Sequence, residues 1–335
     1  MMLKATTLAK LGLGAAGLAV SRRFASLQAV APELRTRSLF LPMPIDNPAT
    51  LQVARRLYGA ASEVDPEVTV ELRTAEAVGA APTQVAVYRP PSRTEPGPAL
   101  LWIHGGGFII GTAGTSNDMC SWIARRLGIV VVSVDYRLAP EDPFPAGLDD
   151  TDTALQWLHS RAGELGVDPA RIAVGGPSAG GGLAAALAQR ALDEDLPVAF
   201  QLLVYPMLDD RTVLRSDHGG TGRVAWSPRS NRFAWTAYLG RPPRAQEPRP
   251  YAAAARRDDL RGLPPAWIGV GALDLFHAED VDYAERLRAA GVPCELRVVP
   301  GMYHGADSLP VPSMRAFREE MLQALAAGLG VTVRP

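Results

Sequence analysis

The hydrophobic positions of this chain form short runs typical of strands, separated by longer stretches typical of helices. Alternating apolar and polar residues at 68–72 and 85–88 predict two half-buried strands. Continuous apolar runs predict strands buried on both faces at 100–103, 129–134, 172–174, 200–205, 267–270 and 296–299. Helical stretches lie between them at 116–127, 149–165, 179–191, 278–290 and 313–327. The pattern predicts an α/β fold with a mostly parallel, eight-stranded sheet and helices on both faces.

One interval breaks this alternation. Residues 207–251 contain no predicted strand and separate two strands by more than a crossover needs. Within it, Ser227-Pro228 predicts the start of a helix that runs to Leu239, where Gly240 ends it. We expect a lid above the carboxyl ends of the strands, where open α/β sheets hold ligands. A satellite helix is the alternative, with the aromatic residues Trp226, Phe233, Trp235 and Tyr238 in a core.

Composition excludes several classes of partner and chemistry. A net charge of −1 over 335 residues gives no general attraction to nucleic acid. Only Lys4 and Lys10 supply primary amines on side chains, so lysine catalysis has no candidate. Cys120 and Cys294 have no metal-ligand spacing, and no two histidines do either, so no metal or cofactor is expected.

The N-terminus has the features of a short signal peptide. Two lysines precede the apolar run 11–20, which is too short to span a bilayer. The best small-residue cleavage site, 29–31, is followed by Pro32. We expect a cytoplasmic protein. Export through residues 1–31 stays open, as does a helix that packs on the body or on a membrane surface.

Gly176-Pro177-Ser178-Ala179-Gly180 lies directly after an apolar strand and before an alanine-rich helix. A serine on such a sharp turn projects its hydroxyl above the sheet, and the helix N-terminus favours developing negative charge. The structural alternative is an ordinary glycine-rich turn. A second motif, His104-Gly105-Gly106-Gly107, follows strand 100–103, and its glycines allow backbone N–H groups to bind an oxyanion. We expect His104 to be a structural hydrogen-bonding group.

A serine nucleophile needs a base, which an acid must orient. His304 follows strand 296–299 in a loop, and Asp274 follows strand 267–270, so both fall at the same sheet edge as Ser178. Glu279, Asp280 and Asp282 fall on the next helix, where we expect a solvated face and cap charges. The order Ser178, Asp274, His304 is that of α/β-hydrolases.

These residues, with the segments 104–108, 135–141, 144–146 and 235–240, resemble the hormone-sensitive-lipase-like family of bacterial esterases and lipases within the α/β-hydrolases. The resemblance covers about residues 32–330. It implies a nucleophilic Ser178, a base in His304 and an orienting acid in Asp274. It also implies an oxyanion hole from the N–H groups of Gly106, Gly107 and Ala179. Pro177 stands where the family usually has an aspartate, and Gly182 stands where it often has an asparagine.

The resemblance implies three parts of the chain: an extension at 1–31, a helical cap from 32–60 with 207–250, and a catalytic domain from 61–206 with 251–335. We expect a carboxylesterase for short- to medium-chain esters, with an acyl-enzyme on Ser178 and with Phe108, Trp226 and Trp235 against the small-molecule substrate. An amidase or peptidase with the same triad, or a non-catalytic receptor, is the alternative. The oligomeric state is left open between a monomer and a homodimer.

Overall fold

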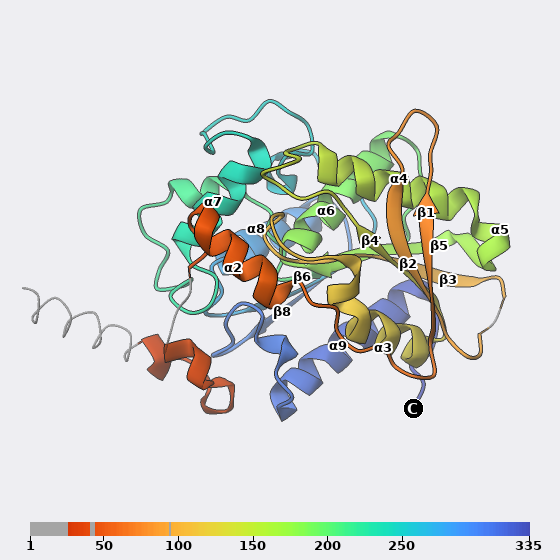
Figure 1. Cartoon of the computed structure of the whole chain (residues 1–335), viewed down its shortest axis with the longest axis horizontal. Helices are drawn as coiled ribbons and strands as arrows, with labels where there is room; N and C mark the ends of the chain where they lie inside the picture. The colour runs from red at the N-terminus through yellow and green to blue at the C-terminus, as the bar shows by residue number, and fades with distance from the viewer. Residues whose placement is uncertain (1–25, 41–43, 94) are drawn as a thin grey trace, which may run out of the picture.

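Eight strands form a single sheet in the computed structural model, which describes residues 26–40, 44–93 and 95–335 (Figure 1). Their order is β1-β2-β4-β3-β5-β6-β7-β8. β2 pairs antiparallel with β1 and with β4, and all other neighbours are parallel. The bounds are β1 (Thr69–Ala75), β2 (Thr83–Arg89), β3 (Gly97–Ile103), β4 (Val130–Asp135), β5 (Val167–Pro177), β6 (Phe200–Val204), β7 (Ala266–Gly271) and β8 (Cys294–Val299). The predicted fold class is therefore confirmed.

Helices cover both faces of the sheet and form two hydrophobic cores. On one face lie α3 (Asn117–Leu127) and α9 (Pro312–Leu329), packed against side chains such as Trp267. On the other lie α4 (Ala146–Ser160), α6 (Ala179–Asp193) and α8 (His277–Ala289). The predicted helix 149–165 is two helices, because the chain leaves helical geometry at Arg161 before α5 (Ala162–Leu165). The strands β3, β4, β6 and β7 and the 172–174 part of β5 are buried on both faces, as their continuous apolar runs predict. The same prediction is wrong for 296–299, because β8 lies at the edge of the sheet and is only half-buried.

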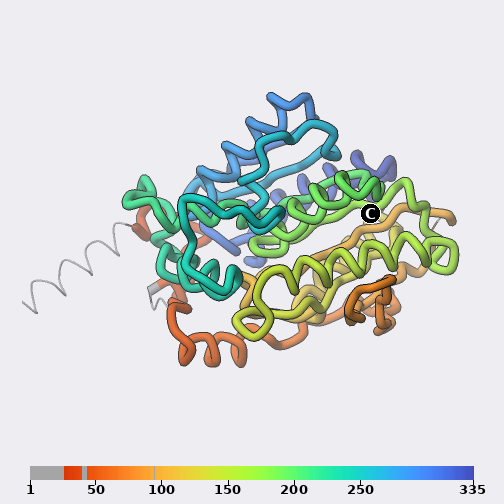
Figure 2. The backbone as a smooth tube through the Cα atoms, turned by 90° about the horizontal axis from the view of Figure 1, so that it is seen from above, coloured from red at the N-terminus to blue at the C-terminus, as the bar shows by residue number. Residues whose placement is uncertain are grey.

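Two helices outside these layers lie at one end of the molecule, α2 (Pro48–Tyr58) and α7 (Pro228–Leu239) (Figures 1 and 2). The α7 helix begins with Ser227 as N-cap and ends at Gly240 in left-handed geometry, as the sequence predicts. The segment before α2 contacts α7: the Ile45 N–H donates to Ser230 Oγ at 3.1 Å, and Asp46 pairs with Arg229 at 2.6 Å. The N-terminal segment and the 207–250 insertion are thus in direct contact.

The predicted signal-like segment lies mostly outside the described residues. Its described end packs on the body, where Leu27 and Val30 are buried and the Ala31 N–H donates to Gly301 O at 3.1 Å. Among the described helices, none has the length and apolar character needed to cross a bilayer.

Candidate active site

Ser178 stands on the turn between β5 and α6 with a positive φ of 57°. This strained conformation is held from both sides, since the Ser178 N–H donates to Val204 O at 2.8 Å and its carbonyl accepts from the Met207 N–H at 2.9 Å. The turn also needs glycine at 180, because an added Cβ would lie 1.9 Å from Ile103 O. Sequence and backbone together therefore place the Ser178 hydroxyl at the carboxyl edge of the sheet.

His304 connects Ser178 to Asp274. Its Nε2 lies 2.9 Å from Ser178 Oγ, and its Nδ1 lies 2.8 Å from Asp274 Oδ2. The Asp274 carboxylate is fully buried, and its second oxygen accepts from the Phe276 N–H at 3.0 Å. With Nδ1–H donating to this carboxylate, Nε2 is the acceptor for the serine hydroxyl. The arrangement can move a proton from Ser178 to His304.

The loops that carry the acid and the histidine are bonded to each other through the main chain. Ala272 N–H donates to Val299 O at 2.9 Å, and Leu273 N–H donates to Met302 O at 3.0 Å. The two loops lie so close together that position 271 requires glycine, because an added Cβ there would lie 2.3 Å from Met302 O. The separation between Asp274 and His304 is thus set by paired backbones.

The glycine loop after β3 turns its backbone with positive φ at Gly106 (114°) and Gly107 (62°). Gly106 O accepts from the Ile109 and Ile110 N–H groups. The N–H groups of Gly106 and Gly107 donate no hydrogen bond to any residue that the structure describes. Ala179 is the first residue of α6, where N–H groups lack partners within the helix. Three donors are thus available close to the serine turn.

His104 lies behind this loop and is fully buried. Burial lowers the pKa of His104 to about 4, so its imidazole is neutral. The ring stacks on Tyr136 at 4.2 Å, and the Tyr136 hydroxyl donates to His104 O at 3.0 Å. These contacts suit the structural role expected for His104, and they show how the segment 135–141 supports the glycine loop.

The three expected substrate-binding residues fall in two places. Trp226 lies over the glycine loop, since a Cβ added at Gly107 would be 2.6 Å from its indole, and its ring is 6.2 Å from that of His304. Phe108 and Trp235 pack together at 5.2 Å in the wall of a small apolar cavity. Gly182 lines the same cavity, and an added Cβ there would lie 2.1 Å from Met207 O, which leaves no room for asparagine.

The expectation of a solvated face at Glu279 and Asp280 is wrong, since both side chains are buried. Glu279 Oε1 accepts from the Leu208 and Asp209 N–H groups at 2.8 and 3.1 Å, and Oε2 accepts from the Thr212 hydroxyl. The insertion folds back over the first turn of α8, so the Glu279 carboxyl faces its backbone, whereas the buried Asp280 carboxyl has no hydrogen-bond partner among the described residues. Burial raises the pKa of Glu279 to about 8 and raises that of Asp280 well above its ordinary value.

Sequence reasoning also missed Arg55, which ties α2 to the glycine loop. Its Nε donates to Ile109 O at 2.8 Å, and its Nη2 donates to Ala139 O at 3.0 Å. Both guanidinium Nη atoms bind Glu141 at 2.8 Å. These partners lie 54 to 86 residues away along the chain, so no local pattern could have identified the contact.

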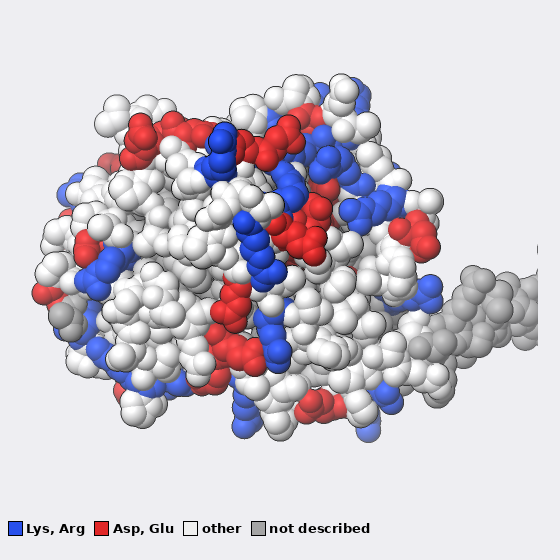
Figure 3. All heavy atoms as spheres, turned by 180° about the vertical axis from the view of Figure 1, so that it is seen from behind, with Lys and Arg blue, Asp and Glu red and all other residues white. Residues whose placement is uncertain are grey.

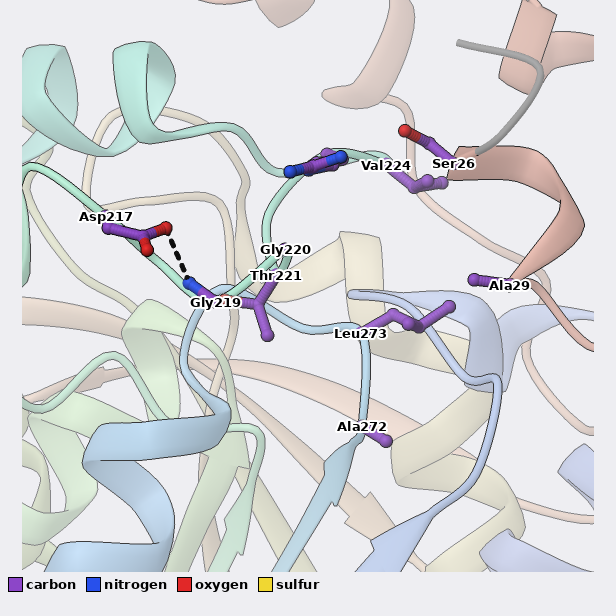
Figure 4. Close-up of a pocket in the computed structure, with 10 residues that line it drawn as sticks. Ser26, Ala29, Asp217, Gly219, Gly220, Thr221, Val224, Ala272 and Leu273 are labelled. Carbon is purple, nitrogen blue, oxygen red and sulfur yellow. Dashed lines mark hydrogen bonds between the residues drawn. The ribbon is translucent and has the colours of Figure 1, made fainter. Parts of the chain in front are cut away.

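A separate hollow of about 440 Å³ lies beside the acid loop, between residues 26–29 and the insertion (Figure 4). Ala272 and Leu273 line it, but neither Ser178 nor His304 does. The residues that the structure describes include no group of His, Cys, Asp and Glu arranged to hold a metal ion.

Comparison with known proteins agrees with this geometry. Residues 100–308 match the family model of the alpha/beta hydrolase fold. The chain is 40% identical to carboxylesterase NlhH of Mycobacterium tuberculosis over 249 residues, covering 72% of this chain and 77% of that protein. It is 37% identical to esterase LipI of the same species, covering 68% and 71%. The structure of a bacterial heroin esterase superimposes with a TM-score of 0.84 at 38% identity, covering 90% of this chain and 99% of that one. The chain therefore belongs to the α/β-hydrolase family and, within it, to the hormone-sensitive-lipase-like carboxylesterases.

Proposed function

We propose that this esterase hydrolyses short- to medium-chain acyl esters through an acyl-enzyme on Ser178. The observation that carries the proposal is the hydrogen-bonded series Ser178–His304–Asp274, with distances of 2.9 and 2.8 Å, beside the glycine loop. His304 Nε2 takes the hydroxyl proton as Ser178 Oγ attacks the ester carbonyl carbon. The N–H groups of Gly106, Gly107 and Ala179 bind the negative oxygen of the tetrahedral intermediate.

The intermediate collapses when His304 returns its proton to the departing alkoxide, and the alcohol leaves. The acyl group now sits on Ser178 Oγ. His304 then removes a proton from a water molecule, which attacks the acyl carbon and releases the carboxylic acid as Ser178 regains its proton. One basic nitrogen, oriented by Asp274, serves both halves of the reaction.

Acyl size follows from the apolar cavity next to the serine turn. Its wall includes Phe108, Trp235 and Tyr238, and its volume is about 10 Å³, which is room for roughly one water molecule. Each additional methylene gains about 0.8 kcal/mol only while there is space to bury it. An acyl chain therefore enters this cavity only as the surrounding rings move, and each added methylene requires a larger displacement. On that ground we infer a preference for acyl chains of about two to eight carbons, with a decline beyond.

A covalent-trapping experiment tests the nucleophile. Ser178→Ala is expected to lower kcat for 4-nitrophenyl butyrate by several orders of magnitude. Mass spectrometry of the quenched wild-type reaction should find a butyryl group on the peptide that contains Ser178. Ser133→Ala is the matched control, because Ser133 is also fully buried but lies on β4. Retention of a tenth of the wild-type turnover by Ser178→Ala rules the proposal out.

A substrate panel tests acyl size and reaction class together. Nitrophenyl esters of increasing chain length are assayed beside an anilide for the wild type and Trp235→Ala. We expect the wild-type optimum below about eight carbons, and a shift to longer chains when the indole is removed. An optimum beyond twelve carbons contradicts the closed cavity. Faster anilide hydrolysis favours the amidase alternative, and no turnover of any substrate favours a receptor.

A further inference from the structure

Tyr205 and Asp307 form a buried pair beside the histidine loop. The Tyr205 hydroxyl donates to Asp307 Oδ1 at 2.6 Å, and the two residues are 102 positions apart in the chain. Tyr205 is 5% exposed and Asp307 is 8% exposed, so this hydrogen bond is shielded from water. Such a bond between a phenol and a buried carboxyl is strong and directional.

The backbone of Tyr205 belongs to the segment that holds the serine turn. Its neighbours Val204 and Met207 make the two main-chain hydrogen bonds to Ser178. Tyr205 itself has a positive φ of 36°, and its N–H donates to Gly269 O at 2.6 Å. A positive φ at a bulky residue is costly, so the surroundings hold this side chain in a fixed direction.

The side chain of Tyr205 points at the histidine. Its ring meets the His304 imidazole edge-on, with centroids 4.7 Å apart. Asp307 lies three residues after His304, on the short helix η6 (Ala306–Ser308). Tyr205 thus contacts the imidazole with its ring and the histidine loop with its hydroxyl, while its backbone abuts the serine turn.

We propose that the Tyr205–Asp307 pair is a positioning device, which keeps His304 Nε2 aligned with Ser178 Oγ and with the leaving oxygen of the ester. The inference rests on the proposed function, because it assigns His304 the proton transfers. The imidazole is bonded at Nδ1 to Asp274 and at Nε2 to Ser178, and the rings of Phe276 and Tyr205 contact it at centroid distances of 5.2 and 4.7 Å. Because the bond to Ser178 is lost once the serine oxygen attacks, the ring contacts must then limit tilting of the imidazole. Contact with the Tyr205 ring limits that tilt, and Asp307 prevents Tyr205 from moving away.

The test compares two esters of one acid in Tyr205→Phe, an isosteric change that removes only the hydroxyl. Ethyl butyrate needs His304 to protonate a poor leaving group, whereas nitrophenolate departs from 4-nitrophenyl butyrate without protonation. We expect kcat/KM to fall about tenfold for the ethyl ester and about threefold or less for the nitrophenyl ester. Tyr88→Phe is the matched control, since it also removes a 2.6 Å phenol bond, to Asn117, but far from the site.

Substitutions at Asp307 supply a rescue test. Asp307→Asn keeps an oxygen that can accept from Tyr205, whereas Asp307→Ala does not. The kcat/KM for ethyl butyrate should therefore be highest in the wild type, lower in Asp307→Asn and lowest in Asp307→Ala. Equal losses for both esters, or a Tyr205→Phe profile identical to that of Tyr88→Phe, overturn the proposal. Failure of the proposed function is distinguishable, because it would leave Ser178→Ala active and no acyl group on Ser178.

Discussion

The triad loops of this esterase and the segments expected to form its cap are held in place by partly different kinds of contact. Main-chain hydrogen bonds join the acid loop (residues 271–275) to the histidine loop (residues 300–305), as between Leu273 and Met302. They also join the serine turn (residues 176–179) to Val204 and Met207. The expected cap (residues 32–60 with 207–250) also has main-chain bonds, such as Phe144 N–H to Tyr238 O at 2.6 Å, but many of its contacts are ion pairs of arginine side chains. Figure 3 shows basic and acidic side chains next to each other on one face of the molecule. Arg256, for example, binds the buried Asp210 at 2.6 Å and two carbonyls near the end of the insertion.

This difference suggests that the triad loops determine the chemistry, whereas the cap contacts affect substrate binding and stability. Main-chain hydrogen bonds depend little on which side chains stand at the bonded positions, so the triad geometry tolerates sequence change around it except where close approach requires glycine, at 180 and 271. Contacts made by guanidinium groups depend on each arginine and each acidic partner. We therefore expect substitutions at the triad to abolish chemistry without unfolding the chain, and substitutions at cap contacts to change binding or stability by smaller amounts.

The largest effect is expected at the acid. Asp274→Asn should lower kcat by about 10⁴-fold, because an amide favours the wrong tautomer of His304. Glu279→Gln should leave kcat within a few-fold of the wild type, since Glu279 contacts the insertion and not the imidazole. The test is to measure kcat for both purified variants and to record unfolding curves that show both are folded. A larger loss in Glu279→Gln would place the orienting acid elsewhere.

The contrast between Asp274 and Glu279 also shows how far the sequence could predict this molecule. Ser178, Asp274 and His304 could be predicted because each follows the end of a strand, and parallel strands bring their carboxyl ends to one edge of the sheet. The same reasoning failed one helical turn later. Acidic residues in a first turn usually serve the helix dipole, and nothing local indicates that the 207–214 segment returns to bury Glu279.

The pair Tyr205–Asp307 and the contacts of Arg55 escaped prediction for a related reason. Each joins residues more than 50 positions apart through side chains, and neither residue type repeats with a period that a helix or strand would impose. Backbone topology follows from hydrophobic periodicity, whereas side-chain pairs across the topology depend on packing that only the structure shows.

Deletion of residues 1–31 is expected to have the next largest effect. It removes the buried side chains of Leu27 and Val30 and the hydrogen bond from Ala31 to Gly301 in the histidine loop. Two buried apolar side chains contribute about 3–5 kcal/mol together, so urea denaturation should show a loss of that order in the free energy of unfolding. Deletion of residues 1–25 keeps each of these contacts and is the control. If the two deletion variants had the same free energy of unfolding, the contacts of Leu27, Val30 and Ala31 would not stabilise the fold.

A smaller effect, on stability and dependent on pH, is expected at Glu279. Its folded-state pKa of about 8 exceeds the ordinary 4.5, so between these values the folded protein binds a proton that the unfolded chain releases. Stability therefore falls as pH rises through this window. Glutamine can accept from the Leu208 and Asp209 N–H groups and donate to Thr212 without titrating. Between pH 5 and pH 8, Glu279→Gln should gain about 1–3 kcal/mol relative to the wild type in the free energy of unfolding, and parallel pH profiles would refute this.

The smallest effect concerns the link between the cap and the glycine loop. Arg55 donates to Ile109 O, Ala139 O and both oxygens of Glu141, and the planar fork that makes these bonds has no equivalent in lysine. Arg55→Lys keeps the positive charge but satisfies fewer of these acceptors, so α2 is held less firmly over the loop. We expect KM for butyrate esters to rise about fivefold with kcat nearly unchanged, which corresponds to roughly 1 kcal/mol.

The matched control for Arg55 is Arg229→Lys. Arg229 on α7 pairs with Asp46 in the segment before α2 and does not contact the glycine loop. The Arg229 side chain is 79% exposed, whereas that of Asp46, which it binds at 2.6 Å, is 10% exposed, and lysine can keep this single ion pair. Its KM should stay within twofold of the wild-type value. A loss of kcat in Arg55→Lys as large as the rise in KM would mean that Arg55 shapes the glycine loop itself. In that case the separation between a main-chain site and a side-chain cap would break down at this residue.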